Sequence, residues 1–120
     1  MNRKEMLIQL RIEKKDPLAI SIGKWQDIVD GKGIDEKANN CALCEVYMSH
    51  RRWFKCRGCP VCKYTNGCGC SKTPYIQFLY GFSSDAKATS AQKMLLLLKM
   101  IRAMETNDWD DIQINRGEQE

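Results

Sequence analysis

The chain has 120 residues and a formal net charge of +4, with 28% charged and 43% hydrophobic residues. This length suits one domain with a modest core and is too short for a comfortable pair of domains. The apolar stretch 6–10 is interrupted by Gln9 and is too short for a signal peptide or a membrane span. We therefore expect a cytoplasmic protein without membrane contacts.

Charge is distributed unevenly along the chain. From Thr106 onward, five acidic residues stand against one arginine, which leaves −4 on this tail and +8 on the rest. The segment 41–72 is especially basic, with six lysines and arginines against one glutamate. We therefore expect acidic partners. We also expect a single metal-stabilised domain over residues 1–105, followed by an acidic, mobile tail over 106–120.

The first two predicted elements are helical. In residues 3–15 the apolar pattern fits either a strand or a helix, and we favour the helix. Asp16 followed by Pro17 is typical of a helix start, and the apolar residues after it fall on one arc as far as residue 30. Trp25 lies on that arc among aliphatic residues, so we assign it to the core.

The second half of the chain ends in a further helix. Residues 31–73 lack regular periodicity, which predicts loops and tight turns around a metal. Residues 75–80 fit a short strand or a buried helical turn. Ser83 or Ser84 then caps a helix that continues to about Glu105. Its predicted buried stripe comprises Ala91, Met94, Leu95, Leu98, Ile101 and Met104.

Seven cysteines, clustered within thirty residues, are the strongest functional signal. An odd number of cysteines in a reducing cytoplasm favours metal binding over disulfides. A structural zinc needs two chelating loops, of which Cys41 and Cys44 form one. The other loop must come from the five remaining cysteines, and Cys59 and Cys70 lie beside turns that could fix their sulfurs. The remaining candidates are Cys56, Cys62 and Cys68.

Two other cysteine chemistries compete with zinc. Cys56, Cys59 and Cys62 match the start of a bacterial ferredoxin motif, although the next cysteine does not follow at the expected spacing. Iron is therefore the alternative metal. A thioredoxin-like redox site would need a βαβ setting that this segment does not offer. His50 is interpreted as a surface residue in a basic loop, with metal ligation as the alternative.

The sequence favours a binding protein over an enzyme. It contains one histidine, no nucleophile elbow and no phosphate-binding GxxxxGK[ST] loop. A basic stretch with aromatic residues instead suits single-stranded nucleic acid or an acidic protein surface. Its aromatic rings could equally fold back over the metal site. The candidate binding residues are Arg51, Arg52, Trp53, Lys55 and Arg57.

Three short motifs resemble a family of small cysteine-rich proteins of phages and prophages. They are NCALC at 40–44, GCPV at 58–61 and CSKTPY at 70–75. The resemblance covers roughly residues 16–105. It implies that the recurring cysteines are Cys41, Cys44, Cys59 and Cys70, that Cys56 is frequent, and that Cys62 and Cys68 are additions.

The resemblance also implies a function, because small phage proteins of this kind include anti-CRISPR inhibitors. We therefore predict a non-enzymatic viral protein that inhibits a host defence nuclease in the host cytoplasm, by binding its surface or blocking nucleic-acid loading. One alternative is a zinc-containing nucleic-acid-binding protein of phage transcription or replication, and another is an iron–sulfur or redox protein. The predicted fold is small and mostly α, with a loop-rich, cysteine-liganded metal site between amphipathic helices.

Overall fold

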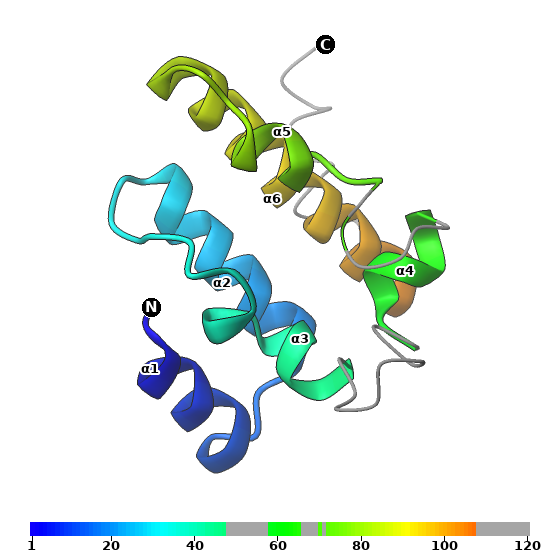
Figure 1. Cartoon of the computed structure of the whole chain (residues 1–120). Helices are drawn as coiled ribbons and strands as arrows, with labels where there is room; N and C mark the ends of the chain where they lie inside the picture. The colour runs from blue at the N-terminus through cyan, green and yellow to red at the C-terminus, as the bar shows by residue number, and fades with distance from the viewer. Residues whose placement is uncertain (48–57, 66–69, 71, 108–120) are drawn as a thin grey trace, which may run out of the picture.

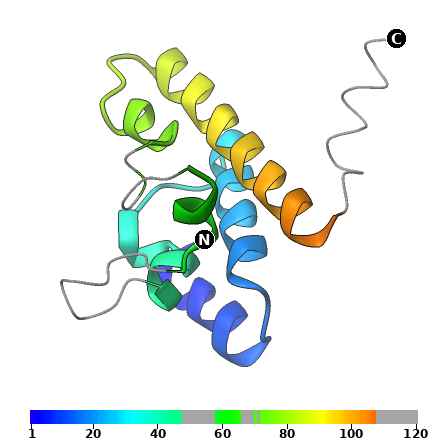
Figure 2. The same ribbon diagram turned by 90° about the vertical axis from the view of Figure 1, so that its right-hand side faces the viewer.

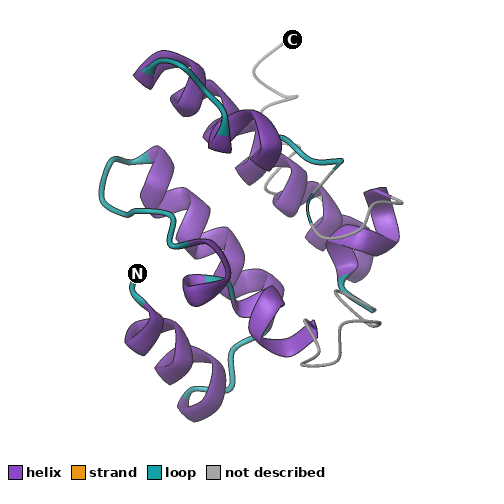
Figure 3. Ribbon diagram, viewed as in Figure 1, coloured by secondary structure: helices purple, strands orange, loops and turns teal. Residues whose placement is uncertain are grey.

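The computed structural model describes residues 1–47, 58–65, 70 and 72–107, and their regular secondary structure is helical (Figure 3). This confirms the predicted small, mostly α fold. The elements in chain order are α1 (Arg3–Leu7), the π-helical turn η1 (Ile8–Ile12), α2 (Pro17–Val29), the 3₁₀ turn η2 (Lys37–Asn40), α3 (Ala42–Tyr47), α4 (Pro60–Thr65), α5 (Tyr75–Leu79) and α6 (Ser84–Thr106).

Helix α2 begins and packs as predicted. The Asp16 side chain accepts a hydrogen bond of 3.1 Å from the Ala19 N–H, and Pro17 occupies the first turn, where its missing N–H costs nothing. Trp25 is only 4% exposed and meets the rings of Tyr75 and Phe78 edge-on, at centroid distances of 5.6 and 5.0 Å. The core assignment of this tryptophan is therefore confirmed.

Helix α6 confirms most of the last predicted element. The Ser83 hydroxyl caps it by accepting from the Ala86 N–H, and Asn107 ends it in the left-handed conformation. The expected stripe is buried through Ile101, but Met104 is 40% exposed, so its assignment to the core was wrong. The end of α6 is still covered by neighbouring parts of the chain, because Ala103 is only 2% exposed. The buried face there includes Ala103 instead of Met104, which periodicity along α6 alone does not show.

The main core lies between α2 and α6, which run side by side (Figure 1). Leu43 of α3 and Val61 of α4 complete this core, and α5 folds back against α6 (Figure 2). A second, smaller cluster joins α1 to the other elements through Met6, Ile20 and Ala42. Helix α3 therefore contacts both clusters. Cys41, which directly precedes α3, consequently lies where the helices meet.

The structure resolves two open assignments and corrects one expectation. Residues 75–80, for which strand and helix were both open, contain the short helix α5, and residues 3–12 are helical as favoured. The segment 31–73 was expected to consist of loops and turns, but its described part contains η2, α3 and α4. Helices of four to six residues are too short to show a hydrophobic period.

No helix in the described part of the chain combines the length and hydrophobicity needed to cross a membrane.

Candidate metal centre

A cavity of about 440 Å³ collects the cysteines predicted as zinc ligands. Residues of α2, α3, α5 and α6 contribute to its wall, together with the turns before α3, α4 and α5. The wall is mostly apolar, because the cavity adjoins the main core. Cysteines from three separate sequence segments therefore meet at one place. The four that line the cavity are Cys41, Cys44, Cys59 and Cys70.

The first cysteine loop surrounds the Cys41 sulfur with hydrogen-bond donors. The Cys44 N–H donates to the Cys41 Sγ over 3.3 Å, and the Leu43 N–H also bonds this sulfur. The pKa of Cys41 falls from 9.0 to about 6, because the Cys44 side chain and these N–H groups hydrogen-bond its sulfur and the Lys24 charge favours the thiolate. Burial of Cys41 opposes this shift. Since metals bind the thiolate, this environment suits a metal ligand.

The second loop repeats the geometry of the first. Helix α4 begins directly after Cys59, whose sulfur is hydrogen-bonded by the N–H groups of Val61 and Cys62. Burial raises the pKa of Cys59, and the nearby charges of Cys62 and Cys41 act in the same direction. A bound cation would reverse this increase in pKa, because its positive charge outweighs the repulsion among neighbouring thiolates. Both CxxC loops therefore have N–H donors around their first sulfur, and both first cysteines line the cavity.

Cys70 is positioned by a turn of the chain before α5. The backbone N–H and the side-chain hydroxyl of Thr73 both donate to the Cys70 carbonyl, at 3.2 and 2.8 Å. Thr73 is itself buried, which anchors the turn in the core. Burial and the neighbouring Asp35 are the main causes that raise the pKa of Tyr75. The charges of Cys70 and Cys41 raise it further, so Tyr75 lies near both cysteines.

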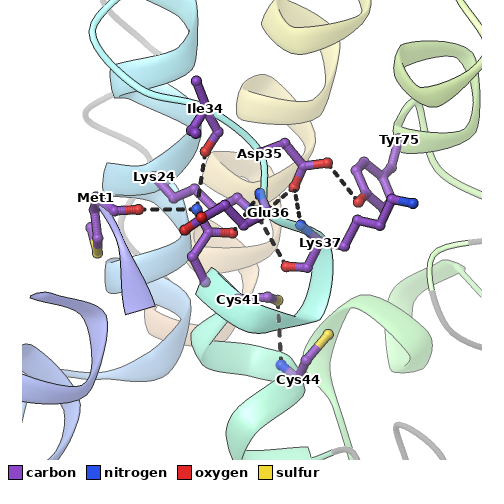
Figure 4. Close-up of polar contacts among 10 residues, drawn as sticks. Met1, Lys24, Ile34, Asp35, Glu36, Lys37, Cys41, Cys44 and Tyr75 are labelled. Carbon is purple, nitrogen blue, oxygen red and sulfur yellow. Dashed lines mark hydrogen bonds and ion pairs between the residues drawn. The ribbon is translucent and has the colours of Figure 1, made fainter. Parts of the chain in front are cut away.

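A buried polar network lies beside the cavity, and three of its members, Lys24, Lys37 and Tyr75, line the wall (Figure 4). The Lys24 Nζ donates to the Asp35 Oδ1 over 2.8 Å, and the Tyr75 hydroxyl donates to the Oδ2 over 2.8 Å. The Lys37 N–H supplies a further bond of 2.9 Å to the Oδ1. Burial opposes ionisation of Asp35, but the Lys24 hydrogen bond and charge outweigh it, and the pKa of Asp35 falls below 3.8. Lys24 is consequently a fixed positive charge near Cys41.

Sequence reasoning did not find this network. Lysine on an apolar helix face carries no special signal, because its stem commonly covers apolar surface while its ammonium reaches water. Here the ammonium is buried instead, with its side chain 4% exposed. Lys24 and Asp35 are 11 residues apart in the sequence, and Asp35 and Tyr75 are 40 residues apart. Only the packing of α2 against the later segments shows the connection.

The donor set suits zinc, but its sulfurs do not surround a common point. Thiolates from short loops are the usual ligands of structural zinc. Within residues 1–47, 58–65, 70 and 72–107, no group of three or more cysteine, histidine or acidic side chains is arranged to hold a metal ion. Metal binding would therefore require the cysteine side chains around the cavity to converge.

Several predicted site residues lie outside the described part of the chain. These are the less certain ligands Cys56 and Cys68, the residue His50, and the binding candidates Arg51, Arg52, Trp53, Lys55 and Arg57. Most of the acidic tail, residues 108–120, also lies outside it. Cys62 is described, and its loop resembles that of Cys41, but it does not line the cavity.

Comparison with known proteins gives no relative: no family model, no curated protein and no solved structure matches this chain.

Proposed function

We propose that this protein is a non-enzymatic binding protein built on one structural zinc ion, with Cys41, Cys44, Cys59 and Cys70 as ligands. The observation that supports the site is that these four residues line one cavity between α2 and α6. The hydrogen-bonded sulfurs of both CxxC loops add to it, because such donors stabilise thiolates. Zinc would supply folding energy to a segment with short helices and little core of its own.

A structural role follows from the number of ligands. Four thiolates complete a tetrahedral coordination sphere and leave no position for an activated water. A zinc hydrolase instead keeps one position open. The proposed set therefore favours scaffolding over catalysis.

The proposed partner is an acidic surface of a host defence nuclease, such as a CRISPR effector. The charge of +8 before residue 106 supports an acidic partner, because complementary charge accelerates and orients association. The resemblance to phage proteins supports the choice of nuclease. Occupying its surface or blocking nucleic-acid loading would then inhibit it.

Elemental analysis of the purified, reduced protein tests the metal. We expect one zinc per chain and no visible absorption band, because Zn²⁺ has a filled d shell. Iron with a charge-transfer band would contradict the proposal and support an iron–sulfur or redox protein. Protein purified without any metal would equally contradict it.

A pair of binding assays tests the partner. Cleavage by a purified CRISPR effector should slow when the protein is added, and fluorescently labelled DNA and RNA alone should remain unbound at low salt. Arg51→Glu/Arg52→Glu should weaken the inhibition. The matched control Lys14→Glu/Lys15→Glu makes the same charge change at exposed positions and should inhibit like the wild type. Direct nucleic-acid binding that falls steeply with salt would instead favour a nucleic-acid-binding protein.

A further inference from the structure

One buried hydroxyl at the cavity has no hydrogen-bond partner in the described part of the chain. Ser21 of α2 is 3% exposed and lines the cavity, yet within the described residues nothing hydrogen-bonds its Oγ. A serine inside a helix commonly bonds the carbonyl four residues before it, but this hydroxyl does not. Buried polar groups are almost always satisfied, so an orphaned donor points to a group that binds there.

Ser21 shares the cavity wall with the first cysteine loop. Lys24 follows Ser21 by three residues, so both side chains lie on the same face of α2. The cavity wall includes both of them as well as Cys41 and Cys44. A hydroxyl donor and a lysine therefore line the same cavity as this loop.

These two groups match the needs of a thiolate-bound metal. Zinc with four thiolates carries a net charge of −2, and each sulfur accepts hydrogen bonds from surrounding donors. Lys24 is held in place by Asp35 at 2.8 Å, and it lines the cavity together with Cys41. The Ser21 hydroxyl can donate a hydrogen bond, and none of the described residues accepts it. Both features suit an anionic sulfur cluster better than an apolar ligand.

We infer that Ser21 and Lys24 form an outer shell of the zinc site: the Ser21 hydroxyl donates to a cysteine sulfur, and Lys24 offsets the charge of the thiolates. Both are positioning residues, since they act on the metal through its ligands. This inference rests on the proposed zinc site. It predicts that Ser21 contributes to metal affinity and contributes nothing to the folding of the metal-free chain.

The test is the zinc affinity of Ser21→Ala, measured by competition with a chromophoric chelator. We expect affinity to fall about 10-fold, as is usual when an outer-shell partner is removed. The melting temperature of the metal-free variant should equal or exceed that of the metal-free wild type, because an unsatisfied buried hydroxyl has been removed. A purely structural serine would lower the stability of both forms together. Ser21→Thr, which keeps the hydroxyl, should restore most of the affinity.

Ser90→Ala provides the matched control. Ser90 is also a buried helical serine, but it belongs to α6 and does not line the cavity. Its replacement should leave zinc affinity unchanged. With Co²⁺ as a spectroscopic probe, the thiolate-to-metal charge-transfer band should shift in Ser21→Ala and not in Ser90→Ala.

The outcomes separate this inference from the proposal on which it rests. If the wild type binds zinc and Ser21→Ala binds it equally tightly, the outer-shell role is refuted while the zinc site stands. If the wild type binds no zinc, both fail. Equal losses of affinity in Ser21→Ala and Ser90→Ala would also refute the outer-shell role, because they would reflect a general weakening of the fold.

Discussion

Cys41→Ser is expected to abolish stoichiometric zinc binding and to destabilise the protein by at least about 3 kcal/mol. The Cys41 sulfur is hydrogen-bonded within its loop, lies near the Lys24 charge and lines the cavity. Serine removes the thiolate, and binding energy that stabilises the folded state is lost with the metal. In a domain of this size the loss corresponds to about 10–20 °C in melting temperature. Elemental analysis and thermal unfolding of the same samples measure both effects.

Cys62→Ser is the matched control for this prediction. Cys62 also belongs to a CxxC loop, but it does not line the cavity, so this variant should retain its zinc and most of its stability. Cys70→Ser should behave like Cys41→Ser. If Cys62→Ser loses zinc and Cys70→Ser keeps it, Cys62 replaces Cys70 in the ligand set. Equal losses at all cysteines would contradict a fixed set of four ligands.

Lys24→Met is expected to reduce the free energy of unfolding by about 3–5 kcal/mol, the usual cost of leaving one member of a buried ion pair alone. The side chains of Lys24 and Asp35 are 4% and 6% exposed, so water cannot replace the lost partner. The Tyr75 hydroxyl and the Lys37 N–H would still bond the carboxylate. These two donors are uncharged, so the negative charge of Asp35 would remain without a positive partner. Urea unfolding at constant zinc concentration measures the loss.

Lys24→Met/Asp35→Asn tests whether the pair accounts for that loss. Asparagine keeps a hydrogen-bonding group near Tyr75 and removes the buried charge, so the double variant should lose less than the sum of the two single variants. Because the folded pKa of Asp35 is depressed below 3.8, its contribution is present above that pH and is lost as pH falls through the folded pKa. The double variant should lack this acid-sensitive component. Additive losses would contradict coupling between Lys24 and Asp35.

The long helices could be predicted because their signals are local. Asp16 and Pro17 mark the start of α2 within two residues, and the apolar arc that follows includes Trp25. The same reasoning located α6 and most of its buried face. It wrongly placed Met104 in the buried stripe, because the elements packed around the end of α6 cover Ala103 instead. Short helices such as α3 and α4 could not be predicted, because one or two turns contain too few residues to show a hydrophobic period.

The sequence by itself determined the two amphipathic helices, the mostly α class and the cysteines worth considering as metal ligands. These follow from residue spacing over a few turns and from the chemistry of sulfur. Only the tertiary structure decided that Cys41, Cys44, Cys59 and Cys70 line one cavity, and that Lys24, Asp35 and Tyr75 form a buried network beside it. Such groups meet because burying the apolar faces of α2 and α6 against each other brings distant segments together, and no local pattern encodes which polar side chains the packing encloses.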